Sequence, residues 1–434
     1  MRKRVLLIGA HASSGHGPHR LTKLFEQAWH ANGADVLVLA NADRLSRHVK
    51  AERPGRGLAA LEGAAGLGRR MTKLAKDVDL VHIVDLRDAV WATDLPGELP
   101  VTVTCHDMGP VQALLGLQPG RRTRPLDRYR GHRHIEALQR ADHLMATSLA
   151  TSDIVHRLTG RPATVLHPPV DPDLRPENLP LGRHRPPAWP YLLVVAGTGR
   201  ADRRDLALQA WISLRRTPSL DGASLVVVGP PLTADEEATV TACGGHVDVI
   251  TDPTDDELRT LYTGTEALLS LGLPGSFAWQ IAEAHAAGRP VIATDAESFH
   301  EVGADGCIYL PTAALDRFDA ATWAAIAEDV TAGTVATRAM TNALRFGWDA
   351  FVAQLPTAAV APAGTPARRK LVVPPSVPLP RVPDPDGVVR VIDLTDDLMI
   401  SRPVTTALTG QALAGQKVAA GPRVSRGSRP APGR

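Results

Sequence analysis

The chain has 434 residues, 44% of them hydrophobic, and carries 48 Lys and Arg against 46 Asp and Glu, for a formal net charge of +2. This length indicates two globular domains rather than one, and the balanced charge argues against a protein that binds nucleic acid. The three cysteines, Cys105, Cys243 and Cys307, form no CxxC pair, so the sequence predicts neither a zinc knuckle nor a disulfide framework, and a reducing compartment fits best.

The N-terminus starts with basic residues, but the apolar run that follows at residues 5–10 is too short for a signal peptide. No apolar run elsewhere reaches the roughly 20 residues of a membrane-spanning helix. We therefore expect a cytoplasmic protein without a transmembrane segment, whose contact with membranes would be peripheral at most.

Short apolar runs alternate with helical patterns in two series along the chain. The first series occupies residues 5–8, 36–39, 80–84, 101–105 and 143–147, and the second occupies residues 192–196, 225–228, 247–250, 267–271 and 291–293. Runs without polar alternation are typical of strands buried on both faces in parallel sheets. The sequence therefore predicts an α/β fold of two doubly wound, Rossmann-like domains that face a central cleft.

A segment dense in proline and charge, residues 176–190, marks the domain boundary. We assign residues 1–185 to the first domain, residues 186–345 to the second, and residues 346–355 to a closing helix that returns to the first. Residues 356–434 form a tail rich in Pro, Gly and Ala, which we expect to be mostly disordered. Its apolar and acidic island at residues 388–400 is either a transient hydrophobic patch or a docking strand or helix for a protein partner or for the protein's own surface.

The first domain contains two candidate sites, each at the end of a predicted strand. Gly15 and Gly17 precede a helix whose first turn holds Pro18, and a loop entering a helix in this way presents backbone N–H groups to phosphate. The alternative is a purely structural turn. His106 directly follows the strand at residues 101–105, at the rim of the expected cleft, where the alternative is a structural histidine.

The second domain opens with a cluster of arginines. Arg200, Arg203 and Arg204 lie between the strand at residues 192–196 and the next helix. Fixed guanidinium groups suit a diphosphate because they donate several hydrogen bonds and keep their charge. The alternative is a solvated charge cluster.

Glu283 lies on a helix of small residues that follows a glycine-containing loop. Ile281, Ala284 and Ala287 form the apolar face of that helix, and Glu283 lies off it. One carboxylate can accept hydrogen bonds from both vicinal hydroxyls of a ribose. The alternative is a solvated surface glutamate.

Five segments resemble, in order and spacing, the GT-B-fold glycosyltransferases of family 4, also described as glycosyl transferases group 1. They are ADHLMATSLATSDIV, VLHPPVDPDLRP, VVAGTGRADRRDLALQAW, DDELRTLYTGTEALLSL and FGWDAFVAQL, at residues 141–155, 165–176, 194–211, 255–271 and 346–355. The resemblance spans about residues 5–355. It implies an acceptor-side first domain and a second domain that binds a nucleotide diphosphate-sugar as co-substrate, with retention at the anomeric carbon, no metal and no other cofactor.

Carried over by position, the resemblance assigns roles to the candidate residues. Gly15 and Gly17 would lie near the diphosphate of the donor, and His106 would lie near the transferred sugar as a catalytic residue. Arg204 matches the phosphate-binding lysine of the family, with Arg203 beside it. Thr198 stands where the family has an arginine, so Arg200 would supply that charge.

The family's E-x7-E motif is only half present. Glu283 matches its second glutamate, which holds the ribose, but Gly275 stands in place of the first. Ser276, Phe277 and Ala278 would offer backbone N–H groups to the sugar or phosphate. Gly275 and Thr198 keep open an alternative, a non-catalytic relative that binds a nucleotide sugar or a partner transferase. A nucleotide-sugar epimerase of the same fold is a third interpretation.

Overall fold

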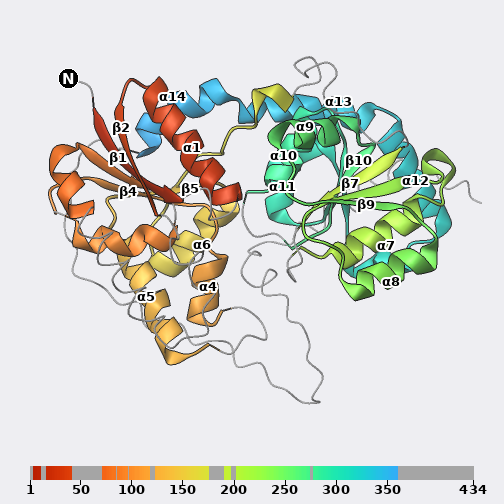
Figure 1. Cartoon of the computed structure of the whole chain (residues 1–434), viewed down its shortest axis with the longest axis horizontal. Coiled ribbons are helices and arrows are strands. Elements are labelled where there is room, and N and C mark those ends of the chain that lie inside the picture. Colours follow the sequence, from red (N-terminus) through yellow and green to blue (C-terminus); the bar gives the residue numbers. More distant parts are fainter. Residues whose placement is uncertain are drawn as a thin grey trace, which may run out of the picture. The chain divides into compact units, whose positions relative to one another are not determined.

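The computed structural model contains two six-stranded sheets in which every strand pairs in parallel with its neighbours (Figure 1). It describes residues 3–10, 16–41, 71–84, 86–95, 97–117, 123–174, 190–196, 202–273 and 277–359. The predictions for the tail, and for Gly15, Arg200, Gly275 and Ser276, lie outside the described residues. The two doubly wound sheets confirm the predicted fold class.

The first sheet has the strand order β2-β1-β3-β4-β5-β6. Its strands in chain order are Arg4–Ala10, Asp35–Asn41, Leu80–Ile83, Val101–Cys105, His143–Ala146 and Thr164–Val165. Its helices are α1 (His16–Ala31), α4 (Gly109–Leu115), α5 (Pro125–Arg140) and α6 (Leu149–Thr159).

Side chains along β1 alternate between two hydrophobic clusters. Leu6 and Ile8 pack into one cluster with residues of α4, α5 and α6, whereas Val5 and Leu7 pack into another with residues of α1. All four are fully buried. Both faces of the sheet are therefore covered, which explains why the strand is apolar without alternation.

The second sheet has the order β12-β11-β10-β7-β8-β9. Strands β7 to β12 are Tyr191–Val195, Ser224–Val228, Val247–Ile250, Ala267–Ser270, Val291–Thr294 and Cys307–Leu310. Helices α7 to α13 are Arg204–Leu214, Ala234–Cys243, Asp255–Gly264, Trp279–Ala286, Glu297–Gly303, Ala320–Thr331 and Thr334–Ala343. Leu192 and Val194 pack with α7 and α12, and Tyr191 and Leu193 pack with α9 and α10.

Helix α14 (Trp348–Ala359) packs against the first sheet. It continues four residues beyond the predicted end at residue 355, through Pro356. A proline inside a helix leaves the carbonyl four residues earlier without its partner. Here the Asn32 side chain donates to that carbonyl, Val352 O, at 2.9 Å, so the helix continues.

Two strands were not predicted, β6 and β12, and both lie at a sheet edge. β6 has only two residues, and three of the four residues of β12 are half-buried, so neither forms a buried apolar run. Among the described helices, none has the length and apolarity needed to cross a membrane. The cytoplasmic location stays a prediction.

Candidate functional site

The junction between β1 and α1 is closely packed. The Ala10 N–H donates to Thr22 Oγ1 at 3.0 Å, which ties the end of the strand to the second turn of the helix. A Cβ on Gly9 would lie 2.4 Å from that hydroxyl, so glycine is required there. Gly17 lies in the first turn of α1, so the predicted phosphate-binding loop runs into a helix N-terminus.

Arg20, one turn further along α1, contacts the second predicted site. Its Nη1 donates to Glu283 Oε1 on α10, an ion pair between residues 263 positions apart in the sequence. Its guanidinium carbon also lies 4.4 Å from the ring centroid of Trp279, the first residue of α10. Helix α1, whose first turn contains Gly17, thus contacts the carboxylate that is predicted to bind the ribose.

Glu283 is buried, with only 4% of the residue exposed. Burial alone lowers the pKa of the Arg20 guanidinium, but the charge of Glu283 and the hydrogen bond to it outweigh this, and that pKa is raised. The phenol of Tyr262 lies beside the carboxylate. Burial first, and the charge of Glu283 second, raise the pKa of Tyr262 well above its usual value. Glu283 is therefore not the solvated glutamate of the alternative interpretation.

The loop before α10 is anchored by aromatic packing. The ring of Phe277 is buried and lies 5.4 Å from Phe346, 5.7 Å from Trp279 and 5.9 Å from His167, between centroids. Ala278 is the N-cap of α10 and has no side-chain cap. No side chain caps this end of the helix, and the N–H groups of Trp279 and Ile281 donate to the carbonyls of Phe277 and Ala278 at 2.9 and 3.1 Å.

Arg204 is almost fully buried, and its donors are directed at the protein. Nε and Nη2 bond to the Glu236 carboxylate, Nη1 donates to Pro230 O at 2.8 Å, and Nη2 donates to Pro231 O at 3.1 Å. Glu236 also closes the capping box of α8 with Thr233. The guanidinium of Arg204 thus fixes the loop between β8 and α8, and four of its hydrogen bonds are already made within the chain.

Arg203 has a different environment. Its side chain is 36% exposed and pairs with Asp205, with Nη2 at 2.9 Å from Oδ2. Its backbone is left-handed, with φ of 44°, a strained conformation for a residue with a side chain. At the end of β8, a Cβ on Gly229 would lie 2.1 Å from Ala196 O, so the ends of β7 and β8 approach each other closely.

His106 directly follows β4 and is half-buried. The Thr147 hydroxyl donates to its carbonyl at 3.5 Å, which links the ends of β4 and β5. The next residue, Asp107, accepts a hydrogen bond from Gly109 N at 2.8 Å and helps to begin α4. The imidazole is thus at the carboxyl end of the first sheet, as predicted.

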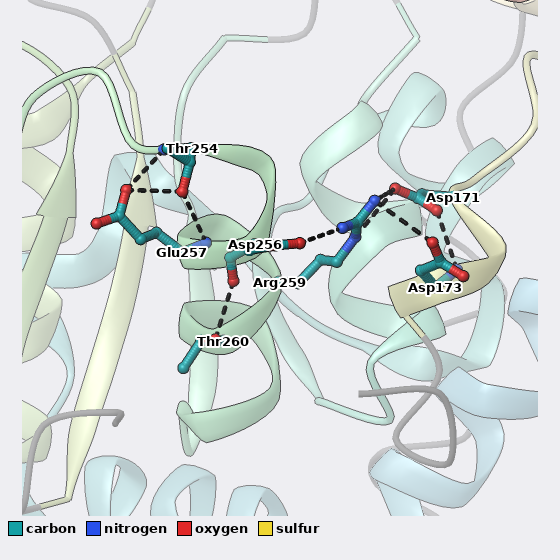
Figure 2. A network of polar contacts seen from close by, with 7 residues as sticks. All are labelled: Asp171, Asp173, Thr254, Asp256, Glu257, Arg259 and Thr260. Carbon is teal, nitrogen blue, oxygen red and sulfur yellow. Dashed lines mark hydrogen bonds and ion pairs between the residues drawn. The ribbon is translucent and has the colours of Figure 1, made fainter. Parts of the chain in front are cut away.

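A polar network joins α9 to the segment that follows the first sheet (Figure 2). Arg259 donates to Asp171 Oδ2 through Nη2 at 2.7 Å and to Asp256 Oδ1 through Nη1 at 2.6 Å. Asp173 lies 3.6 Å from the same guanidinium. Val170 N donates to Phe346 O at 3.0 Å close by, so this segment is held to the second part of the chain at two points.

Of the residues that the structure describes, the predicted set falls into three places. Phe277, Ala278 and Glu283 lie together at the start of α10, beside α1. Arg203 and Arg204 lie at the start of α7, and His106 lies at the end of β4. The site roles of these residues stay predictions. Sequence reasoning missed Arg20 and Tyr262, because their contacts with Glu283 join distant segments that no local motif connects.

Two family models match the chain in succession. The model described as Glycosyltransferase Family 4 matches residues 16–174, and the model described as Glycosyl transferases group 1 matches residues 190–328. No curated protein sequence matches the chain.

Solved structures with similar folds include HepE from Anabaena in complex with UDP and glucose, with a TM-score of 0.57 and 16% identity. Sucrose-phosphate synthase from Thermosynechococcus elongatus matches with a TM-score of 0.60 and 16% identity. Each comparison covers 82% of this chain and 98% of the other. An α,α-trehalose 6-phosphate synthase from Burkholderia multivorans matches at 0.60 with 12% identity, over 83% and 98% of the two chains.

Proposed function

The chain belongs to the glycosyltransferases of family 4 and group 1, and from this we propose that it transfers a sugar from a nucleotide diphosphate-sugar to an acceptor hydroxyl, with retention and without a metal ion. The observation that carries the proposal is the buried Glu283 carboxylate, next to the uncapped start of α10. A carboxylate in this place can accept hydrogen bonds from the two ribose hydroxyls, and the positive end of the helix dipole suits a phosphate.

The diphosphate is the group that leaves, so its developing negative charge is what the site must stabilise. We assign this role to the loop that holds Gly15 and Gly17, the first turn of α10, and the arginines Arg200 and Arg203. Arg204 then fixes the loop after β8, because its donors are directed at Glu236 and two carbonyls. A guanidinium keeps its charge throughout the reaction, which suits a site that works without a metal ion.

In the transfer, the bond between the anomeric carbon and the phosphate oxygen breaks, and a bond to the acceptor oxygen forms on the same face of the sugar. The acceptor's proton passes to the departing phosphate oxygen, so no protein base is required. His106 would contact the sugar and help to orient it. Ser276, Phe277 and Ala278 would offer backbone N–H groups to the sugar or phosphate.

The residue expected to set the sugar specificity, Gly275, departs from the family pattern. Gly275 brings no carboxylate to the sugar hydroxyls, so we expect a donor whose hydroxyl pattern does not need one. HepE is described in complex with UDP and glucose, which makes UDP-glucose the first donor to test.

The test is a thermal-shift screen of the full chain with UDP, GDP, ADP and their sugar conjugates, because a bound ligand raises the apparent stability. At least one nucleotide should raise the melting temperature, and Glu283→Gln should remove that shift. Glu297→Gln, at an exposed position on α11, is the matched control and should keep it. A chain that no nucleotide stabilises would contradict the proposal.

Retention and independence from metal can be tested only by following the transfer reaction. Once a donor is found, NMR of the product with an acceptor should show the anomeric configuration of the donor, and EDTA should leave the rate unchanged. Inversion would contradict retention, and loss of activity with EDTA would contradict independence from metal. Donor binding without transfer to any acceptor would favour the non-catalytic alternative.

A further inference from the structure

The carboxylate that we assign to the ribose already has a partner within the chain. Arg20 donates to Oε1 of Glu283, and the side chain of Glu283 is only 6% exposed. A carboxylate oxygen bonded to a guanidinium is less available to a hydroxyl donor. A ribose that uses both oxygens of Glu283 therefore competes with Arg20.

Arg20 is held by two groups on the same face of α10. Trp279 and Glu283 are one helical turn apart, and the guanidinium lies over the ring of the first and pairs with the carboxylate of the second. Trp279 also packs against the hydrophobic clusters of both sheets. The arginine thus occupies a defined place rather than one of many surface positions.

The neighbouring hydroxyl supports the idea that this place takes another ligand. Tyr262 is completely buried beside the Glu283 carboxylate, and burial and this charge raise the pKa of the phenol, but within the described part of the chain its oxygen makes no hydrogen bond of good geometry. A buried hydroxyl without a partner is uncommon and costs stability. A Glu283 carboxylate freed from Arg20, or a bound hydroxyl, would give Tyr262 a well-aligned partner.

We propose that Arg20 is an internal competitor for the nucleotide: its guanidinium occupies Glu283 in the free protein and leaves when the ribose hydroxyls of the donor bind. This inference rests on the proposed function, since it needs a nucleotide at Glu283. The exchange keeps Glu283 paired in both states, so the buried carboxylate is never left without hydrogen-bond donors. The ion pair with Arg20 thus reduces the affinity for every nucleotide that carries a ribose diol.

The test measures the dissociation constant of the nucleotide found in the screen, by calorimetry, for the full chain and for Arg20→Met. Met keeps a flexible apolar stem over Trp279 but removes the charge. Affinity should tighten by at least about threefold in Arg20→Met, which corresponds to about 0.65 kcal/mol, because the ribose no longer has to displace a charged partner. Lys23→Met, at an exposed position on the same helix, is the matched control and should leave the affinity unchanged.

A second ligand separates competition at the ribose from a general change in the site. The 2′,3′-dideoxy form of the same nucleotide lacks the two hydroxyls that would replace Arg20, so its affinity should not tighten in Arg20→Met. Equal tightening for both ligands would overturn the proposal, because the effect would not concern the ribose.

The other possible outcomes separate the competitor role of Arg20 from the proposed function. An unchanged or weaker affinity for the ribonucleotide in Arg20→Met would overturn the competitor role and leave the proposed function in place. Binding of no nucleotide by the wild type or either variant would overturn both. If Arg20→Met does not fold, Arg20→Lys supplies the comparison, because it keeps the charge but loses the planar fork and should tighten binding by a smaller factor.

Discussion

The Glu301 carboxylate accepts a hydrogen bond from His167 Nε2 at 2.7 Å and also caps the start of α6. Leu149 N donates to Oε1 at 2.6 Å, and Ala150 N donates to Oε2 at 3.3 Å. The next N–H, that of Thr151, is satisfied by Ser148. A carboxylate more than 150 residues away thus completes the capping of this helix, and its charge suits the positive end of the helix dipole.

Replacing Glu301 by Ala should therefore destabilise the chain by about 1 kcal/mol, as expected for a lost cap. The melting temperature should fall by roughly 2 °C, since large chains shift little for each kcal/mol. Glu297→Ala, at an exposed position on the same helix, should leave the melting temperature unchanged. Equal melting temperatures for Glu301→Ala and the wild type would show that the cap contributes nothing.

We expect a larger loss of stability when Arg204 is replaced. Arg204→Met removes a buried guanidinium from the half-buried Glu236 carboxylate, which then keeps its bond from Thr233 N, and breaking such an ion pair costs about 3 kcal/mol. Denaturant unfolding should register this loss, whereas Arg203→Met, at the exposed neighbouring position, should change stability little. The double variant Arg204→Met with Glu236→Gln should recover part of the loss, and strict additivity would argue against a direct pair.

Two buried histidines predict a loss of stability in acid. Trp29 Nε1 can only donate, so Nδ1 of His82 accepts at 3.0 Å, and Nε2 carries the proton towards Thr104 at 2.7 Å. Burial lowers the pKa of His82 to about 3, and burial likewise lowers the pKa of His285 to about 4. The unfolded chain binds protons near pH 6.5, so the free energy of unfolding should fall as the pH drops from about 6.5 towards these values.

Urea unfolding at a series of pH values checks this expectation. The slope between pH 6.5 and pH 4.5 should be shallower for His82→Gln than for the wild type. His30→Gln, at an exposed position on α1, should keep the wild-type slope. A slope that His82→Gln does not alter would mean that other groups control stability in this range.

The cysteines should differ in reactivity. Burial raises the pKa of the thiols of Cys105 and Cys307 to about 12 in each case, which leaves little thiolate at neutral pH. Cys243 is half-buried at the end of α8. Ellman's reagent should therefore titrate one thiol quickly in the native chain and none quickly in Cys243→Ser, while all three should react in denaturant. Fast reaction of the Cys243→Ser variant would contradict the raised pKa of the thiols of Cys105 and of Cys307, which is itself half-buried.

The sequence allowed most strands to be predicted because burial on both faces leaves an uninterrupted apolar run, as at residues 101–105, which match β4. It could not show β12, whose edge position leaves Cys307, Ile308 and Tyr309 half-buried. The same limit applies to the site. Glu283 could be proposed as a site residue from the helix around it, but Arg20 lies 263 residues away, and only the fold brings the two together.

The contacts of Arg204 also could not be predicted from the sequence. A cluster of arginines after a strand suggests phosphate, because charge and position are all that a sequence displays. Its partner Glu236 follows 32 residues later as part of a capping box, and the carbonyls of Pro230 and Pro231 are not visible as acceptors in a sequence. Backbone acceptors and long-range partners are what decide whether a buried arginine is available to a ligand.

Helix α14 has a consequence for the order in which the protein is assembled during synthesis. Phe351, Leu355 and Ala359 are buried with residues of β1 and α1, and Thr102 Oγ1 donates to Ala359 O at 2.6 Å. The first sheet thus lacks part of its core until residue 359 has left the ribosome, although its own strands are translated first. We expect nascent chains stalled before α14 to expose that apolar face and to bind chaperones, and chains released after it to mature without help.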